Sequence, residues 1–418
     1  MNTTTTLFLP CASGAEALLT AEVQGITGTR PEAARGGVWV QGDVLTAMQL
    51  SLHSRLAQRV LWPLIDGPYR DEHDLYDLAR RVPWGDWITP AQTLRVDVNA
   101  QRSPLHSLNF AALRIKDAVC DTLREATGER PSVDTRHPDL PLLLFVGPEH
   151  ATLYADTSGE ALFKRGWRED KGEAPLKETL AASMLAAMGW QGRAEDGPLF
   201  DPCCGAGTIA IEAAQMACGI APGSLRRFAF ETLQPFKPQL GAWQQMKAQA
   251  RAQVHPPRVP VFAGDVSFRM VDFATRNAER AGVLHAIEFK TADALQRLPP
   301  AAAGTMVLNP PYGERMAPKG HGQNHGQLEA ARTDDDSARQ GFEGGGSSAE
   351  FFSALAAHWK RQSPGWRAWL LSPDMKLPSL MRLKESRRVP MWNGAIECRL
   401  FRFEMVAGSN QGAAAKAL

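Results

Sequence analysis

From about residue 172 onward, the sequence alternates short apolar runs with amphipathic ones, and this rhythm constrains the fold more than any other feature. Such alternation is typical of a parallel sheet whose strands are joined by crossover helices. We therefore predict a doubly wound, Rossmann-like α/β domain over residues 166–407. Its expected strands are residues 197–201, 259–265, 286–293, 304–312, 365–373 and 395–405, and its expected helices are residues 173–190, 207–219 and 267–282.

The first 165 residues have a different sequence pattern, because strand-like and helix-like segments are mixed and there is no glycine-rich phosphate loop. We expect an α+β module that binds a ligand and carries no catalytic site. Its expected helices are residues 14–26 and 109–128, and its expected strands are residues 36–43, 94–100 and a hairpin over 140–159.

Two further segments have compositions that do not favour a packed core. Residues 317–349 are rich in Gly, His, Gln, Asp and Ser, and residues 408–418 form a small, polar terminus. Such segments bury too little apolar surface to offset the entropy of ordering, so we predict a disordered insertion and a disordered tail.

The stretch "DPCCGAGTIAIEAA" at residues 201–214 places an acid at a strand end, then a Gly-x-Gly turn, then a helix. Gly205 and Gly207 allow a sharp turn that a ligand can approach closely, and the helix N-terminus offers free N–H groups. The dinucleotide fingerprint requires a third glycine, which is missing here. The turn therefore fits a nucleoside without a diphosphate.

Acidic residues end the first three expected strands of this domain. Asp201, Asp265 and Asp293 follow successive strands, so they should share the carboxyl rim where open α/β sheets bind ligands. A single acid at such a position is more often a helix cap than a ligand contact. Three in succession favour a ligand site, with Asp265 placed to accept hydrogen bonds from ribose hydroxyls.

The sequence "LNPPYGER" at residues 308–315 follows the fourth expected strand. The amide oxygen of Asn309 and the carbonyl of Pro310 can together accept both protons of one planar amino group. Pro310 and Pro311 stiffen the turn and add no competing N–H, and Tyr312 offers a flat face on which an extracted base can stack. A rigid turn alone would also explain the prolines, but the upstream turn and acids favour a catalytic site.

With these motifs, the chain resembles the class I S-adenosylmethionine-dependent amino-methyltransferases. The stretches "FKRGWRED", "EAPLKETLAA" and "RRVPMWNGAIECRLFRFEM" resemble the THUMP-containing branch that methylates the N2 of guanine in 23S ribosomal RNA. The resemblance implies that residues 1–165 form a ferredoxin-like plus THUMP RNA-binding module. It also implies S-adenosylmethionine as cofactor, bound by Asp201, Pro202, Cys204, Gly205, Gly207, Thr208, Asp265, Asp293 and Asn309.

The same resemblance implies a mechanism of direct displacement on a flipped-out base. The guanine would stack on Tyr312 and present its N2 to Asn309 and Pro310, with Pro311 stiffening the turn. We assign no general base and no metal ion. The expected phosphate contacts are Arg114 and Lys116 in the N-terminal module, and Lys164, Arg165 and Arg168 before the catalytic domain.

Composition excludes several other classes of protein. Lys plus Arg number 46 and Asp plus Glu 45, so net charge alone does not demand a polyanionic partner. The six cysteines show no zinc-binding spacing, and there is no basic leader or long apolar run. We expect reduced thiols, a cytoplasmic location, no membrane contact and a monomer.

Two alternatives remain open on the sequence. The substrate could instead be a guanine N2 in tRNA or an adenine N6, because both are exocyclic amines. A third hypothesis is a non-catalytic RNA-binding or ribosome-assembly factor. The expected partner under the first hypothesis is 23S ribosomal RNA or a large-subunit precursor.

Overall fold

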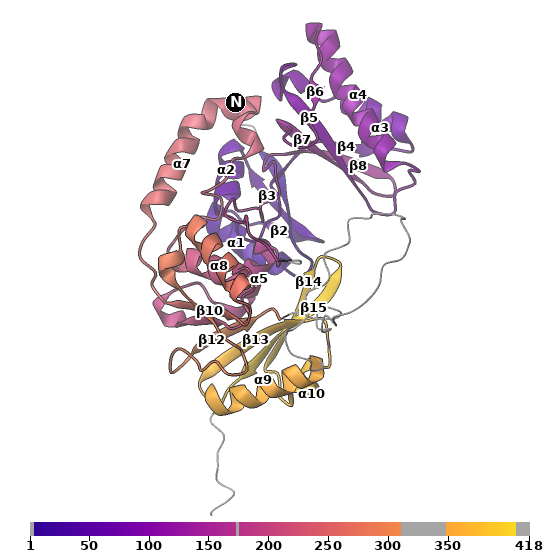
Figure 1. The fold of residues 1–418 in the computed structure, drawn as a ribbon. Helices are drawn as coiled ribbons and strands as arrows, with labels where there is room; N and C mark the ends of the chain where they lie inside the picture. The colour runs from indigo at the N-terminus through magenta and orange to yellow at the C-terminus, as the bar shows by residue number, and fades with distance from the viewer. Residues whose placement is uncertain (1–3, 173–174, 311–347, 407–418) are drawn as a thin grey trace, which may run out of the picture. The chain divides into compact units, whose positions relative to one another are not determined.

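The computed structural model describes residues 4–172, 175–310 and 348–406, which divide into two compact units (Figure 1). Unit 1 comprises residues 1–165 and 221–253, and unit 2 comprises residues 166–220 and 254–418. Residues 221–253 lie within the α/β domain expected at 166–407, yet they group with unit 1. Each unit contains its own sheet.

Unit 1 has an eight-stranded mixed sheet in the order β2-β3-β1-β4-β8-β7-β5-β6. The strands are β1 Thr5–Pro10, β2 Glu32–Ala34, β3 Gly37–Gly42, β4 Leu61–Pro68, β5 Thr93–Ala100, β6 Ser132–Val133, β7 Leu140–Val146 and β8 His150–Asp156. The helices are α1 Glu16–Thr27, α2 Val44–His53, α3 Glu72–Arg80, α4 Leu108–Thr127 and α7 Leu240–Ala252.

Local sequence explains the longest helix of this unit. Ser107 accepts a hydrogen bond from the Phe110 N–H at 3.2 Å and caps α4, and Gly128 ends the helix with a left-handed φ of 84°. Ala111, Ile115 and Ala118 recur at helical spacing and are buried. Two of the expected helices and the 140–159 hairpin are therefore present as α1, α4 and β7–β8.

An aromatic cluster joins residues 221–253 to the rest of unit 1. The Phe236 ring centroid lies 5.9 Å from that of Trp62, and Trp62 lies 5.9 Å from Trp87. On the same segment, Phe230 packs at 5.0 Å against Trp243 of α7, which is fully buried. These side chains complete the hydrophobic core of unit 1 from a segment that follows it by more than fifty residues in the sequence.

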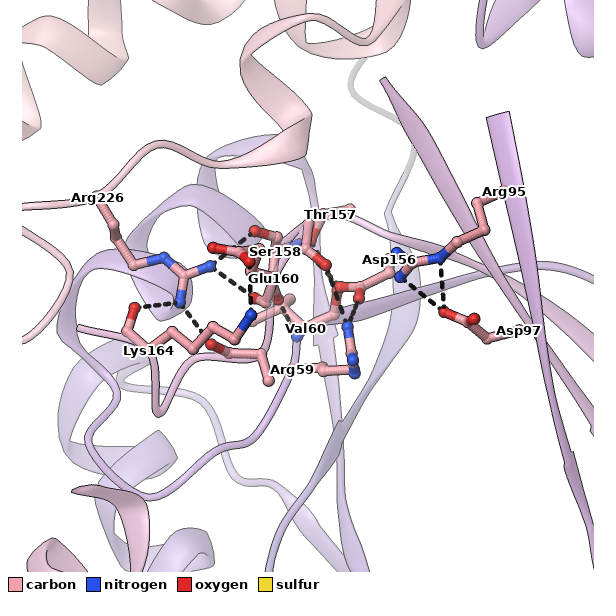
Figure 2. A network of polar contacts seen from close by, with 12 residues as sticks. Arg59, Val60, Arg95, Asp97, Asp156, Thr157, Ser158, Glu160, Lys164 and Arg226 are labelled. Carbon is pink, nitrogen blue, oxygen red and sulfur yellow. Dashed lines mark hydrogen bonds and ion pairs between the residues drawn. The ribbon is translucent and has the colours of Figure 1, made fainter. Parts of the chain in front are cut away.

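Arg226, from the same segment, binds the backbone of the turn that follows β8 (Figure 2). Its guanidinium donates to the carbonyls of residues 158, 160, 161 and 164 at 2.6–3.1 Å. Burial lowers the pKa of Arg226 to about 10, although nearby Asp156 and Glu160 favour its charged form. The four carbonyls accept hydrogen bonds from the two terminal nitrogens, which would otherwise be desolvated at considerable cost.

Unit 2 has a seven-stranded sheet in the order β11-β10-β9-β12-β13-β15-β14. The strands are β9 Leu199–Asp201, β10 Val261–Asp265, β11 Ile287–Thr291, β12 Gly304–Leu308, β13 Trp366–Ser372, β14 Arg387–Asn393 and β15 Ile396–Glu404. Strands β9 to β13 are parallel, whereas β15 pairs antiparallel with both β13 and β14.

The helices of unit 2 cover both faces of this sheet, as a doubly wound fold requires. They are α5 Glu178–Met188, α6 Thr208–Ala217, α8 Phe268–Arg280, α9 Ser348–Gln362 and α10 Leu377–Met381. Phe352 and Leu355 of α9 share a buried cluster with Phe200, Met306 and further side chains of β13 and β15. Helix α6 packs on β9 and β10 and against α5 and α8.

The predicted fold class is confirmed, and the structure corrects several details. The expected helix 173–190 begins only at Glu178, and β14 was not anticipated. Of the expected disordered insertion 317–349, residues Ser348 and Ala349 belong to α9. The rest of that insertion and the expected tail 408–418 lie outside the described residues.

Candidate functional site

The candidate site lies where the strand order of unit 2 reverses. Strand β9 is at the centre, with β10 on one side and β12 on the other. In open parallel sheets the loops above such a switch point diverge and leave a crevice for a ligand. Asp201 ends β9 and Asn309 directly follows β12, so both lie at this rim.

The glycine turn connects β9 to α6 with two left-handed residues. Gly205 has φ 52° and Gly207 has φ 86°. A Cβ on Gly205 would meet no atom within 4 Å, whereas a Cβ on Gly207 would lie 2.9 Å from the Ala274 Cβ. Gly205 thus leaves open space above the turn, and Gly207 allows α6 to approach α8 closely.

Asp201 is the most perturbed acid of the site. One carboxylate oxygen accepts the Cys203 N–H at 3.2 Å, and the other, Oδ2, is buried with no hydrogen-bond partner in the described residues. Burial, with a contribution from Asp265, raises the pKa of Asp201 to about 8. The side chain is therefore protonated at neutral pH, and its free oxygen can donate a hydrogen bond to a ligand.

The second acid, Asp265, holds the turn together. Its carboxylate accepts the Gly205 N–H at 3.0 Å and the Ser267 N–H at 2.9 Å. Burial raises the pKa of Asp265, while these two hydrogen bonds oppose the shift. Asp293, two residues beyond β11, accepts the Leu295 N–H at 2.8 Å. The three predicted acids therefore all follow neighbouring strands of one sheet, each anchored by at least one backbone N–H.

Asn309 presents an unused acceptor at the same rim. Its Oδ1 atom is buried and lacks a hydrogen-bond partner within the described part of the chain, and the adjacent Pro310 is buried. A buried carbonyl without a partner is costly unless a ligand supplies a donor. Pro311 and Tyr312, which the sequence also predicted here, lie outside the described residues.

The remaining predicted cofactor residues lie in or beside the turn. Pro202 and Cys204 are buried, and Thr208 is the first residue of α6. Burial and the neighbouring carboxylates raise the pKa of both Cys203 and Cys204 well above that of an ordinary thiol. Both cysteines are therefore protonated thiols, which are poor nucleophiles.

Sequence reasoning missed two side chains that bind backbone carbonyls in the glycine turn and in the neighbouring strand β10. The Asn277 side-chain amide donates to the Ala206 carbonyl at 3.1 Å, and Arg297 donates to the Ala263 carbonyl at 2.6 Å. Asn277 carried a usable signal, because it lies on the buried face of α8 with Met270 and Ala274, where an apolar residue is expected. A polar side chain at such a position requires a hydrogen-bond partner.

The predicted phosphate contacts divide into buried and exposed groups. Arg165 is 2% exposed and donates to the carbonyls of Leu162 and Arg55, so its expected role as a phosphate contact does not fit its position. Arg168 is largely buried and ion-paired with Glu178 at 2.7 Å, which also argues against phosphate contact. The charge of Arg165 and Arg168 can be read from the sequence, but their burial cannot.

The other three predicted cations are more exposed than Arg165 and Arg168. The side chain of Lys164 is 53% exposed and pairs with Glu160. Arg114 and Lys116 of α4 each pair with Asp117, at 3.9 Å and 2.7 Å. The side chains of Arg114 and Lys116 are 22% and 30% exposed, so they are only partly accessible, whereas the more exposed Lys164 can exchange its partner for a phosphate at small cost.

Two further observations concern the described residues as a whole. They hold no cluster of three or more His, Cys, Asp or Glu side chains arranged to bind a metal ion. None of the helices they form has the length and apolar character needed to cross a bilayer.

Three protein-family models match successive parts of the chain. Residues 6–61 match the RlmL ferredoxin-like domain, and residues 69–156 match the THUMP domain. Residues 165–328 match the RMKL-like methyltransferase domain. The first two segments fall within unit 1, and the third includes the glycine turn, the three acids and Asn309.

A curated relative and two solved structures resemble this chain over most of its length. "Ribosomal RNA large subunit methyltransferase K/L" of Shewanella amazonensis is 35% identical over 97% of this chain, but the chain spans only 54% of that relative. A structure titled "SMU.472, a putative methyltransferase complexed with SAH" (S-adenosylhomocysteine) has a TM-score of 0.80 at 24% identity, covering 97% of this chain and 99% of that one.

The second structure, from Listeria monocytogenes, is titled "a predicted N6-adenine-specific DNA methylase". It has a TM-score of 0.77 at 26% identity and covers 96% of both chains. The similarity to this structure extends through both units of the fold. The chain thus contains a ferredoxin-like domain, a THUMP domain and an RMKL-like methyltransferase domain.

Proposed function

We propose that this chain transfers a methyl group from S-adenosylmethionine to the exocyclic N2 amine of a guanine in 23S ribosomal RNA. The observation that carries the proposal is the buried, unpartnered Oδ1 of Asn309 at the sheet's switch point. An amino group that donates to this oxygen and to the Pro310 carbonyl satisfies both acceptors and directs its lone pair away from them. The relatives named ribosomal RNA methyltransferases, together with the THUMP domain, support ribosomal RNA as the substrate.

The residues of the turn fit the cofactor. Gly205 leaves space for a nucleoside to approach the backbone, and the buried Oδ2 of Asp201 lacks a partner among the described residues. Asp265 and Asp293 would hold the ribose and the adenine amine from neighbouring strands. S-adenosylmethionine supplies an electrophilic methyl group on a sulfonium, which is a good leaving group.

The protein's own contribution is alignment and exclusion of water. Asn309 and Pro310 would hold the amine in line with the methyl group, and Tyr312 would stack on the extracted base. Because the sulfonium needs little activation, no strong base is required, and the amine loses its proton after transfer. Lys164, Arg114 and Lys116 are the proposed phosphate contacts.

The decisive experiment uses isotopically labelled S-adenosylmethionine and ribosomal RNA from cells that lack this protein. The nucleosides are then separated and identified by mass spectrometry. Label in N2-methylguanosine of the large-subunit RNA supports the proposal. Label in N6-methyladenosine or only in tRNA contradicts the substrate assignment, and RNA binding without transfer points to a non-catalytic factor.

The role of Asn309 is tested by Asn309→Ala. We expect kcat to fall by about 10²–10³-fold, the cost of losing one preorganised polar contact to the reacting group. The affinity for S-adenosylhomocysteine should change by less than about threefold, because the acceptor faces the amine. Asn393→Ala, the same replacement at the end of β14, is the control and should leave kcat unchanged. An unchanged rate for Asn309→Ala would exclude this mechanism.

A further inference from the structure

Arg168 joins three parts of unit 2 that are separate in sequence. Its Nε donates to Glu178 at 2.7 Å, at the start of α5. One terminal nitrogen, Nη2, donates to the Thr208 hydroxyl at 2.7 Å and to the Leu176 carbonyl at 3.3 Å. A single guanidinium thus links the segment before α5 to the first residue of α6.

The pair is embedded in the protein. The side chains of Arg168 and Glu178 are 14% and 3% exposed, and the Arg168 guanidinium lies 4.9 Å from the ring centroid of Trp167. Burial raises the pKa of Glu178, and the charge of Arg168 opposes that shift. A buried ion pair adds little net stability compared with apolar side chains, so its presence calls for another explanation.

Thr208 connects the Arg168–Glu178 ion pair to the glycine turn. It directly follows Gly207, whose left-handed φ of 86° sets the direction of α6. The Thr208 side chain is buried, and its hydroxyl accepts the hydrogen bond from Arg168. The orientation of the first turn of α6, and hence of the N–H groups above Gly205 and Gly207, is therefore coupled to Arg168.

One terminal nitrogen of Arg168, Nη1, is buried and has no hydrogen-bond partner in residues 4–172, 175–310 and 348–406. The hydrogen bonds that the guanidinium makes are with Glu178, Leu176 and Thr208, so its position is set by the protein itself.

We propose that Arg168 is a positioning residue for cofactor binding, which acts through Thr208 on the first turn of α6 and is itself held by Glu178. The inference rests on the proposed function, because it concerns the same cofactor site. It assigns Arg168 to the methyl-donor side of the reaction and removes it from the RNA-contacting surface.

Charge and exposure distinguish this role from an RNA contact. Arg168 is neutralised by Glu178, and its terminal nitrogens point to protein acceptors or are buried. Lys164, four residues earlier, has a side chain that is 53% exposed. A phosphate could replace the partner of Lys164 without desolvation, but it would have to displace the buried Glu178 to reach Arg168.

The test measures S-adenosylhomocysteine binding by calorimetry in the absence of RNA, using Thr208→Val and Thr208→Ser. Valine matches threonine in shape but removes the hydroxyl that Arg168 contacts, whereas serine retains it. We expect Thr208→Val to bind about tenfold more weakly, as for loss of one buried hydrogen bond to a charged group, and Thr208→Ser to bind almost as wild type. In turnover assays, KM for S-adenosylmethionine should rise and KM for RNA should stay constant.

Arg168→Met and its control Arg193→Met complete the experiment. Arg193 is another unit 2 arginine, half exposed and paired with Asp196, so its replacement should leave S-adenosylhomocysteine binding unchanged. Weaker cofactor binding in Arg168→Met with normal RNA affinity supports the inference. Loss of RNA affinity with normal cofactor binding overturns it. If Arg168→Met does not fold, the comparison of Thr208→Val with Thr208→Ser decides.

Failure of the inference and failure of the proposed function give different results. If the wild-type protein does not bind S-adenosylhomocysteine, the proposed function is wrong. If the wild-type protein binds it and Thr208→Val binds equally well, the function stands and the positioning role of Arg168 is excluded.

Discussion

Asp201 is a buried acid whose ionisation affects the stability of the unliganded protein. Its pKa is about 8 in the folded chain, compared with a reference value of 3.8. Between these values the folded state retains a proton that the unfolded state has lost. The unfolded state then binds fewer protons, so the free energy of unfolding decreases as pH rises through this window.

This decrease in the free energy of unfolding with rising pH leads to a prediction for Asp201→Asn, because asparagine cannot ionise. Wild-type stability should fall between pH 5 and 8 by up to about 1.4 kcal/mol per pH unit from this group alone. The melting temperature of Asp201→Asn, relative to wild type, should therefore increase steadily over that range. Differential scanning fluorimetry across the pH series provides the measurement.

Asp196→Asn is the matched control for this experiment. Desolvation is opposed by hydrogen bonds from Arg193 and nearby N–H groups, which together hold the pKa of Asp196 below its ordinary value. Its ionisation is complete by pH 5, so the difference from wild type should be constant from pH 5 to 8. A constant difference for Asp201→Asn as well would show that Asp201 is ionised in the folded protein.

Single residues also show where sequence reasoning was limited. Asp201, Asp265 and Asn309 were predicted at the rim because each follows a strand, and strand ends can be read from apolar runs. Arg165 and Arg168 were predicted as phosphate contacts from their charge, and the structure places both in largely buried positions. An arginine looks the same in sequence whether it binds backbone carbonyls, a buried glutamate or a phosphate. Only the surrounding fold determines which partner it has.

At the scale of elements, the glycine turn between β9 and α6 has two left-handed positions with different surroundings. Gly205→Ala introduces only backbone strain, because its Cβ would meet nothing within 4 Å. We expect a loss of about 1–2 kcal/mol of stability. Gly207→Ala adds a clash with Ala274 at 2.9 Å, so the loss should exceed about 3 kcal/mol.

Denaturant unfolding of both variants provides the test of this difference. Cofactor binding should fall further in Gly207→Ala, because the clash displaces the start of α6. Equal losses in the two variants would mean that α6 moves away from α8 without cost, and the close packing inferred at Gly207 would then be wrong.

The elements predicted correctly were those whose apolar residues recur with a clear helical or strand spacing. Amphipathic α4 and α8 and the buried strands β9, β10 and β12 have clear apolar patterns and defined ends. Strand β14 was missed because it is an edge strand with Arg387, Arg388 and Pro390, residues that interrupt an apolar run but suit a strand without a second neighbour.

For the whole molecule, the division into two units predicts separable unfolding transitions. A ligand stabilises the unit that binds it. S-adenosylhomocysteine should therefore raise the melting temperature of unit 2, which contains the glycine turn, and leave that of unit 1 nearly unchanged. Scanning calorimetry with and without the ligand identifies each transition.

Trp243→Ala then tests which unit residues 221–253 stabilise. Trp243 is fully buried against Phe230 and Phe228, so its removal should cost about 3–5 kcal/mol. The transition that is insensitive to S-adenosylhomocysteine should move to lower temperature. If the ligand-sensitive transition moves instead, α7 belongs energetically to unit 2, and the assignment of this segment to unit 1 is wrong.

Residues 221–253 could not be assigned to unit 1 from sequence, because periodicity identifies an element but not its distant partners. Their apolar side chains read equally well as part of the α/β domain in which they are embedded. The aromatic contacts of Phe236 with Trp62, and the carbonyls bound by Arg226, depend on long-range packing that no local pattern encodes.

This arrangement also sets the order of events during synthesis on the ribosome. A nascent chain that ends at residue 165 contains every strand of the first sheet, but it lacks Phe236, Trp243 and Arg226. Trp62 and Trp87 then remain uncovered until translation has passed residue 253. The N-terminal unit is therefore translated first but completed late, and chaperones have their best access to the chain in that interval.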